Sequence, residues 1–306
     1  MTIAIVGAGL AGLLAASVFQ RAAVFEAGSR EQMTHKAVLR FRSRAVGDAV
    51  GVDFKPVAVH KGLWHNNEFV APNIALANQY SQKVIGKIGD RSIWNLETAQ
   101  RWIAPESLLE QLADRSEGRV RWDTAVGEGF FSEARERDTT IISTIPMSAL
   151  AKFLKTPATP EFQYAPIKVR RWRIRNCNVY QTIYYPTRWS PLYRASITGS
   201  LLIAESMDWP GADDTDTIEA TLQDSFGLSC LAEQRIDETK QRYGKIAPID
   251  DVWRRRFIYN ATATNNIYSL GRFATWRNVL LDDVLSDVAV IKRLLAADPY
   301  ERARAL

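Results

Sequence analysis

A glycine motif near the start of the chain constrains its fold more than any other feature. Residues 7–12, with the sequence GAGLAG, fit the pattern G-x-G-x-x-G. An apolar run at 3–6 precedes the motif, and a helix-like run at 13–19 follows it. A second apolar run at 22–25 then ends in Glu26. This order of strand, glycine turn, helix, strand and acid is typical of the first half of a dinucleotide-binding unit.

The glycines and the acid each have a physical role in such a unit. Gly7 permits the tight turn, Gly9 lets the backbone approach a pyrophosphate, and Gly12 lets the helix pack closely against the strand. The helix start offers unpaired N–H groups and a positive dipole end to the phosphates. Glu26 stands 19 residues after Gly7, where a carboxylate accepts both ribose hydroxyls and repels a 2′-phosphate, which disfavours NADP. The short span from Gly12 to Glu26 predicts a first helix trimmed by about one turn.

Composition places the chain among ordinary soluble proteins. Its 306 residues are enough for two domains or one large one, and 46% of them are hydrophobic and 24% charged. No apolar run approaches the roughly 20 residues that a membrane span needs. The apolar start lacks a basic segment before it, so a signal peptide is not expected. Cys177, Cys230 and the three histidines show no disulfide or zinc pattern, so we expect the cytoplasm and no metal site.

A basic strand is predicted over residues 168–175. The net charge of the chain is +5, and alternation places Arg171, Arg173 and Arg175 on one face of this strand. Arginines pair with phosphates and neighbouring aromatic rings can stack on bases, so the strand is a candidate nucleic-acid surface. The alternative is a solvated strand edge that discourages aggregation.

Strand and helix signals predict an α/β fold in which one domain interrupts another. A Rossmann-like domain, with a parallel sheet and flanking helices, is expected to hold the cofactor. A smaller mixed or antiparallel β domain for the substrate is expected to interrupt it, because the middle of the chain is rich in Trp, Tyr, Arg and Thr. The cofactor-binding domain is expected over residues 1–60, 105–150 and 255–306, and the substrate domain over residues 61–104 and 151–254.

Local patterns also predict individual elements. A proline in its favoured first-turn position starts a helix over 105–112. Strands are expected over 119–122, 138–146, 179–185 and 267–270, and helices over 216–226, 231–240 and 283–295, the last one capped by Asp282.

Four segments carry a resemblance to a known superfamily. They are the glycine motif with Glu26, the short strand at Val120, the apolar segment Ile141–Pro146 that ends in Thr-x-Pro, and the segment Tyr268–Arg272. Together they are similar to the flavin-dependent amine oxidases, protoporphyrinogen oxidases and UDP-galactopyranose mutases. In that superfamily the second segment meets the adenine through its backbone. The fourth lies beside the flavin, ahead of a helix that points its N-terminus at the isoalloxazine.

This resemblance implies FAD as the cofactor, held without a covalent link. A terminal strand–Gly-Arg–helix unit that returns to the first domain favours FAD over NAD. Arg272 and a helix start near Asp282 would stabilise the negative charge that a flavin gains on reduction. The superfamily's Arg-x-Gly-Gly segment is missing, so Arg40 or Arg42 is expected to supply the pyrophosphate contact. The residues expected at the cofactor are Gly7, Ala8, Gly9, Leu10, Ala11, Gly12, Glu26, Arg42, Val120, Thr144, Gly271, Arg272 and Asp282.

The resemblance also implies that an amine is oxidised, which requires mainly positioning from the protein. The substrate C–H must face the flavin, the amine must be neutral, and water must be largely excluded. Candidates for the aromatic walls of such a site are Tyr184, Tyr185, Trp189, Tyr193 and Trp276, and of these Tyr185 and Trp276 are expected at the reaction centre. Arg194 and Lys61 are candidates to hold a carboxylate or phosphate of the substrate, and Lys61 is also a candidate to hold a water at the flavin. No Ser-His-Asp or Cys-His arrangement points to covalent hydrolysis.

A narrower resemblance suggests a substrate. The compact, basic, cysteine-poor chain resembles flavin-dependent lyases of bacteriophage pathways that hypermodify thymine in DNA. It implies an amino-acid-modified thymine as substrate, DNA or a modified nucleotide as partner through Arg171, Arg173 and Arg175, and the host cytoplasm as location. Two alternatives stay open. One is a mutase-like flavoenzyme that acts without net oxidation on a sugar nucleotide, and the other is a non-enzymatic nucleotide- or DNA-binding module.

Overall fold

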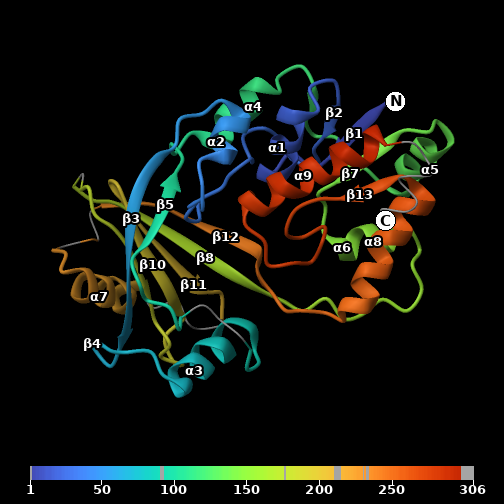
Figure 1. Ribbon diagram of the computed structural model, residues 1–306. Coiled ribbons are helices and arrows are strands. Elements are labelled where there is room, and N and C mark those ends of the chain that lie inside the picture. The colour runs from blue at the N-terminus through green and yellow to red at the C-terminus, as the bar shows by residue number, and fades with distance from the viewer. Residues whose placement is uncertain are drawn as a thin grey trace.

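Two β-sheets and the helices around them organise the chain (Figure 1). The computed structural model describes residues 2–89, 93–175, 177–209, 215–229, 231 and 234–297. Cys230 lies outside these ranges, and Cys177 is a half-buried free thiol.

The first sheet, sheet A, is parallel and has the order β13-β7-β1-β2-β6. β1 pairs with β2, the next strand in the chain, on one side and with the later strand β7 on the other, so the strand order reverses at β1. In such folds ligands bind at the carboxyl ends of the strands at this switch point. The strands of sheet A are β1 (Ile3–Val6), β2 (Ala23–Phe25), β6 (Val120–Arg121), β7 (Thr140–Ser143) and β13 (Ile267–Ser269).

Helices cover both faces of sheet A because successive strand residues point to opposite sides. Ile5 packs in the core of one face and Val6 in the core of the other. The first face is covered by α1 (Leu10–Val18), α2 (Ala45–Val50), α4 (Leu108–Arg115) and α9 (Leu281–Ala296), and the second by α5 (Glu128–Glu136), α6 (Met147–Phe153) and α8 (Asp251–Asn265).

The second sheet, sheet B, is mixed and has the order β12-β8-β11-β10-β9-β3-β4, with β5 also paired to β3. In sheet B, the β3–β9 pair is parallel and all the other strand pairs are antiparallel. Helices α7 (Thr215–Phe226) and α3 (Ile74–Ile85) pack on opposite faces. The strands are β3 (Lys55–His65), β4 (Glu68–Phe69), β5 (Ala99–Ile103), β8 (Tyr164–Arg173), β9 (Tyr180–Tyr184), β10 (Leu192–Thr198), β11 (Leu201–Met207) and β12 (Arg235–Ile246).

The α/β fold with an inserted β region is confirmed, and two local predictions are wrong. The segment 231–240 was expected to be helical, but strand β12 runs through it from Arg235. The strand at 168–175 is not a sheet edge, because β8 pairs with β12 on one side and β11 on the other. The boundaries expected after residues 60 and 254 fall inside β3 and α8.

Candidate functional site

The glycine loop has the geometry of a dinucleotide-binding turn. Gly7 has a φ of +97°, and a Cβ added there would lie 2.3 Å from Thr144 Oγ1. A Cβ on Gly12 would lie only 1.8 Å from the Gly7 carbonyl oxygen, so helix α1 can approach β1 only with glycine at this position. A Cβ on Gly9 would meet no atom within 4 Å. The loop is therefore tight on its inner side and open at Gly9.

The start of α1 lies at this open position. Gly9 is the N-cap residue, and no side chain of the described residues caps it. The N–H groups of the first helical turn have no partner within their own helix. Together with the positive end of the helix dipole, they form an anion-binding site of the kind that holds a pyrophosphate.

Glu26 is fixed beside the loop at the end of β2. Its Oε2 accepts a hydrogen bond from the Ala8 N–H at 2.6 Å, and its Oε1 accepts one from the Gly28 N–H at 3.0 Å. A carboxylate has about four lone-pair sites, so both oxygens can still accept hydroxyl groups. The carboxylate is therefore placed and oriented as a ribose-binding group requires.

Thr144 and Val120 support this site from neighbouring strands. The Thr144 hydroxyl donates to the Val6 carbonyl oxygen at 2.8 Å, and its N–H donates to the same oxygen at 2.9 Å. Val120 pairs with Val24 in the edge strand β6. Thr144 thus fastens the end of β7 to the glycine loop, and Val120 continues sheet A beyond Glu26.

Gly271 brings the last part of the chain against the glycine motif. It has a φ of +87°, and a Cβ there would lie 2.8 Å from the Ala11 Cβ. The next residue, Arg272, reaches toward sheet B, where its Nη2 donates to the Gly244 carbonyl oxygen at 3.4 Å. The Gly-Arg segment therefore bridges the motif helix and the end of β12.

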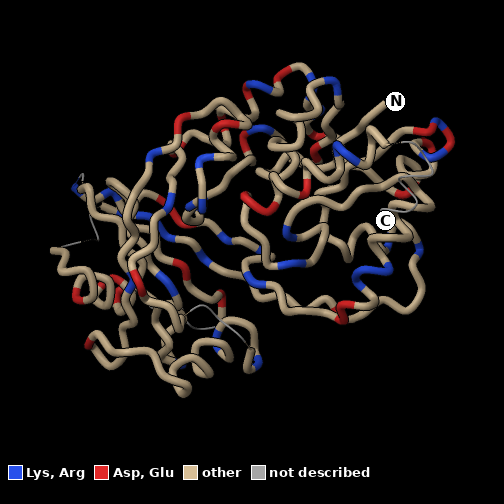
Figure 2. Tube along the Cα trace, viewed as in Figure 1, with Lys and Arg blue, Asp and Glu red and all other residues tan. Residues whose placement is uncertain are grey.

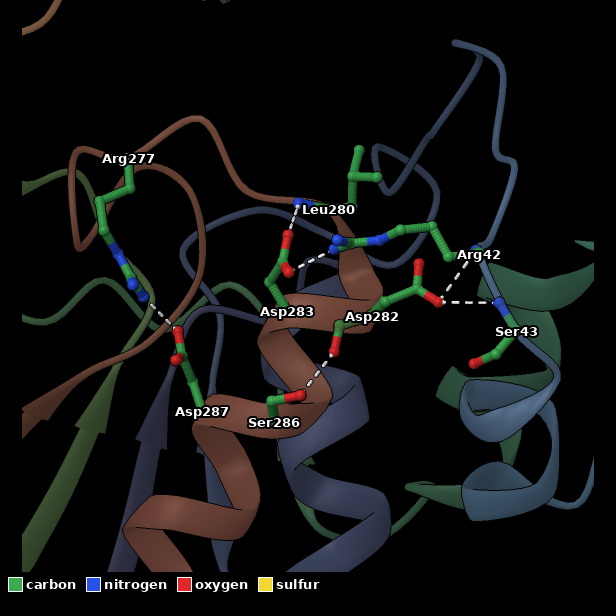
Figure 3. A network of polar contacts seen from close by, with 8 residues as sticks. All are labelled: Arg42, Ser43, Arg277, Leu280, Asp282, Asp283, Ser286 and Asp287. Carbon is green, nitrogen blue, oxygen red and sulfur yellow. Dashed lines mark hydrogen bonds and ion pairs between the residues drawn. The ribbon is translucent and has the colours of Figure 1, made fainter. Parts of the chain in front are cut away.

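A polar network surrounds the start of α9 (Figure 3). The backbone N–H groups of Arg42 and Ser43 donate to Asp282 Oδ1 at 3.0 and 3.3 Å, and the Arg42 guanidinium forms an ion pair with Asp283. The Leu280 N–H donates to Asp283 Oδ2 at 2.8 Å. The expected helix cap at Asp282 is thus wrong, because the N-cap residue is Leu280 and the carboxylate that caps it belongs to Asp283.

Asp282 instead has one carboxylate oxygen that accepts no hydrogen bond from the described residues. Its Oδ2 is buried and has no hydrogen-bond partner among the described residues. A buried acceptor without a donor is costly, so this oxygen suits a ligand hydroxyl. Arg42, which was expected at the pyrophosphate, is held by Asp283 at the same helix start.

On sheet B, Arg194 and Glu205 face each other across β10 and β11. Arg194 donates to Glu205 through Nη2 at 2.6 Å and Nε at 3.1 Å, and the Tyr193 hydroxyl also donates to this carboxylate. Burial opposes ionisation of Glu205, but Arg194 and Lys245 outweigh it and lower its pKa to about 2. Glu205 is therefore an ionised carboxylate with a side chain only 2% exposed.

Arg40, in the segment after β2, bonds to the face of sheet B that carries Arg194 and Glu205. Its Nη2 donates to the Gln181 and Ile197 carbonyl oxygens, both at 2.9 Å, and its Nη1 donates to the Thr182 hydroxyl. Burial, and repulsion from Arg194, lower the pKa of Arg40 to about 10. Because these donors are spent on sheet B, Arg42 is the better placed of the two candidates for a pyrophosphate contact.

Of the four residues expected to carry the chemistry, Lys61 and Arg194 share a face of sheet B, whereas Tyr185 and Trp276 lie in two separate cores. Tyr185 is 2% exposed and shares a core with α7, where its hydroxyl lies 2.7 Å from Ser225 Oγ, so it cannot wall a substrate. Trp276 is 3% exposed and donates through its indole N–H to the Ala247 carbonyl oxygen at 2.9 Å. Tyr185 is a packing residue, and Trp276, although buried, lines a cavity of about 250 Å³. Aromatic character alone does not distinguish core from site.

Lys61, the third of these residues, lies on β3 and donates to the Asn95 carbonyl oxygen at 3.3 Å. Burial and the charge of Arg101 lower its pKa, and Glu97 partly offsets them. Lys61 pairs in register with Thr182, the residue that accepts a hydrogen bond from Arg40, so its position on β3 is on the same face of sheet B as Arg194. Tyr193, one of the aromatic candidates, also belongs to that face, and the residues of the face that sequence reasoning missed are Glu205 and Lys245.

A cavity of about 550 Å³ lies between the end of α3 and the points where β8 begins and β12 ends. Tyr164, Trp209 and Lys245 are among its lining residues. The Lys245 ammonium also lies 4.2 Å from the centroid of the Tyr193 ring. Since the Tyr193 hydroxyl is bonded to Glu205, Lys245 connects this cavity to the charged face of sheet B.

The alternation predicted for the basic strand is confirmed, but its charges are largely paired. Trp172 is fully buried, while Arg173 and Arg175 are exposed. Arg171 donates to Asp237 at 2.8 and 2.5 Å, and Arg173 pairs with Glu106 at 3.2 Å. Figure 2 shows acidic residues interspersed with lysine and arginine along sheet B.

The described residues contain neither a membrane-spanning helix nor a metal-binding cluster. No described helix is long and apolar enough to cross a membrane. In the same part of the chain, no group of three or more His, Cys, Asp or Glu residues is placed to hold a metal ion.

No protein-family model matches the sequence, and no curated protein matches it. Solved structures do. A reduced UDP-galactopyranose mutase has a TM-score of 0.67 at 14% identity, over 96% of this chain and 94% of that one. A redesigned putrescine oxidase has a TM-score of 0.58 at 12% sequence identity, and the match covers 97% of this chain and 99% of that one. A probable FAD-dependent monooxygenase from Pseudomonas aeruginosa has a TM-score of 0.54 at 11% sequence identity, and the match covers 97% of this chain and 86% of that one. At such identities the likeness concerns the fold, which this chain shares with that mutase, that oxidase and that monooxygenase.

Proposed function

We propose that this chain is an FAD-dependent oxidoreductase with a non-covalently held cofactor. The observation that carries the proposal is the open position at Gly9, at the uncapped start of α1, with the Glu26 carboxylate fixed beside it. This combination suits a pyrophosphate and an adjacent ribose. The fold that the chain shares with flavoenzymes supports FAD over other dinucleotides.

The described residues fit FAD at both of its ends. The glycine loop and the start of α1 would hold the pyrophosphate, and Glu26 the adenosine ribose. Asp282, whose Oδ2 lacks a donor, would accept a hydroxyl group near the start of α9. When bound, FAD supplies two-electron redox chemistry. The remaining tasks of the protein are to bind and orient the substrate and to exclude water.

A pair of matched glycine variants tests the cofactor site. Gly9 and Gly127 are both helix N-cap residues in extended conformation, and an added Cβ meets no atom within 4 Å at either. Gly9→Val would fill the space of the pyrophosphate, so we expect loss of FAD from the purified protein. Gly127→Val is the control and should keep the FAD content of the parent. Equal FAD content in both variants would remove the assignment.

For the reaction, we propose oxidation of an amine C–N bond to an imine, with the two electrons passing to the flavin, followed by hydrolysis of the imine. The reacting amine must be neutral. Arg40 and Arg194 supply positive charge on the face of sheet B that carries Glu205. Positive charge lowers the pKa of a nearby amine. Anaerobic mixing with amino acids and diamines should bleach the flavin, whereas bleaching by none of them would count against this reaction.

A mutase-like reaction on a sugar nucleotide is a second candidate. The same positive charge on sheet B favours it, because such a substrate carries a diphosphate. In that case activity should appear only after the flavin has been reduced with dithionite. The third hypothesis, a binding module without catalysis, would be supported by a protein that carries no flavin.

The proposal of a modified thymine in phage DNA, cleaved in a lyase reaction, rests on the basic strand. Asp237 and Glu106 already pair with Arg171 and Arg173. Arg175 is exposed, and the described residues offer it no acidic partner. Mass spectrometry of nucleosides from DNA exposed to the protein tests this substrate. Replacing all three arginines with Gln should weaken DNA binding and flatten its salt dependence if the strand is the DNA-binding surface.

A further inference from the structure

On the face of sheet B that carries Glu205, the two guanidinium groups of Arg40 and Arg194 act on this one carboxylate, so among these three described residues the positive charge exceeds the negative charge. Arg40, Arg194 and Lys245 all act electrostatically on or near one carboxylate, that of Glu205. We call these four residues the cationic floor. Burying more cations than anions is costly unless an anion compensates them. The floor therefore suits a ligand with negative charge.

Arg194 has a guanidinium edge available for such a ligand. Its Nε and Nη2 both face Glu205, and the described residues offer no partner to Nη1. The Arg194 side chain remains 31% exposed, while the Glu205 side chain is 2% exposed. Glu205 thus fixes the orientation of the Arg194 guanidinium through Nε and Nη2 and leaves its Nη1 edge accessible.

Arg40 provides a second, independent observation. Its Nε is buried and has no hydrogen-bond partner among the described residues, although both of its other nitrogens are bonded to sheet B. Arg40 also lies close enough to Arg194 for the two charges to repel. An oxyanion between or beside them would relieve this repulsion and supply an acceptor.

We propose that the substrate carries a carboxylate or phosphate group that binds the Nη1 edge of Arg194, with Arg40 contributing the second positive charge. Glu205 and Tyr193 are positioning residues that hold Arg194. This inference rests on the proposed function, and it narrows the substrate to an amine that also bears an oxyanion. Lys245 lies at the border between the cationic floor and the 550 Å³ cavity, which offers space for the rest of the molecule.

The test uses FAD-loaded protein with inorganic phosphate and acetate as probes. Each probe is titrated by calorimetry at constant ionic strength set with chloride, so that general screening is excluded. The test variant is Arg194→Gln combined with Glu205→Gln, which removes the cation without leaving a buried carboxylate unpaired. The control is Arg30→Gln combined with Asp114→Asn, because that ion pair is exposed and lies outside the proposed site.

We expect saturable binding of at least one probe to the parent and to the control, and binding weaker by at least about tenfold in the test variant. Stronger binding of phosphate indicates a phosphorylated substrate, and stronger binding of acetate indicates an amino-acid-like one. If the double variant does not fold, Arg194→Lys keeps the charge but loses the planar fork, and it should also bind less tightly.

Two results separate this inference from the proposed function. FAD-loaded parent that binds neither probe, or a folded test variant that binds as tightly as the parent, overturns the oxyanion site and leaves the flavoenzyme assignment standing. A protein without FAD that still binds phosphate or acetate through Arg194 supports the oxyanion site and removes the flavoenzyme assignment.

Discussion

At the scale of single residues, Glu26 is held by two backbone N–H groups, one of them from inside the glycine loop. Glu26→Gln keeps the shape of the side chain but removes the negative charge that strengthens hydrogen bonds from ribose hydroxyls. We expect FAD affinity to fall by about tenfold, because the variant loses about 1–2 kcal/mol of charge-assisted hydrogen bonding. Titration of apoprotein with FAD, followed by flavin fluorescence, measures this. An unchanged dissociation constant would mean that Glu26 does not contact the cofactor.

Glu205 makes a residue-scale prediction about pH. Its pKa in the folded protein is about 2, below the usual 4.5. A lowered carboxylate pKa stabilises the fold above the unfolded-state pKa, and this contribution is lost as pH falls toward the folded-state value. The contribution is on the order of 3 kcal/mol. Urea unfolding at about pH 6 and pH 3 should show a larger loss of stability in the parent than in Glu205→Gln, and equal losses would contradict the assignment.

Residues close in sequence were predictable and distant partners were not. The glycines and Glu26 lie within one strand-turn-helix-strand unit, so their spacing alone indicates their roles. Arg40 bonds to Thr182 and Gln181, more than 140 residues away, and no local pattern identifies such a pairing. The same holds for Glu205, whose neighbours on β11 are mostly apolar.

At the scale of elements, β12 shows where local pattern fails. Its sequence RIDETKQRYGKI is mostly polar, with apolar residues near its two ends, and the local pattern predicts a helix over part of it. The strand forms because β8 pairs along it, with Arg171 opposite Asp237 and Arg170 opposite Glu238. Charge complementarity across two strands, rather than apolar alternation, gives this segment its structure.

Lys83 carries the prediction for an element, because it fastens α3 to sheet B. Its ammonium is buried and donates to the carbonyl oxygens of Tyr185 and Thr187, both at 2.8 Å, and of Leu192. Lys83→Met leaves these acceptors without their donor, which should cost about 2–4 kcal/mol of unfolding free energy. Lys87→Met, at an exposed position just past α3, is the control. Equal urea midpoints for both variants would show that α3 is held by apolar packing alone.

At the scale of the whole molecule, the return of the chain end to its beginning was predictable. The late strand signal at 267–270 and the glycine after it indicated a return to the first domain, and β13 does join sheet A beside β7. The extent of sheet B was not predictable from composition. β3 extends from residue 55 across the expected boundary, because its partners β5 and β9 lie far along the chain.

The central hypothesis about the whole molecule is that the glycine loop at the carboxyl end of β1 holds FAD. The most direct measurement is the amount of FAD that the purified protein releases on heating, identified by chromatography and divided by the concentration of the chain. We predict a yellow protein that releases close to one FAD per chain as the free, unmodified cofactor. A colourless protein that takes up no added FAD would contradict the account.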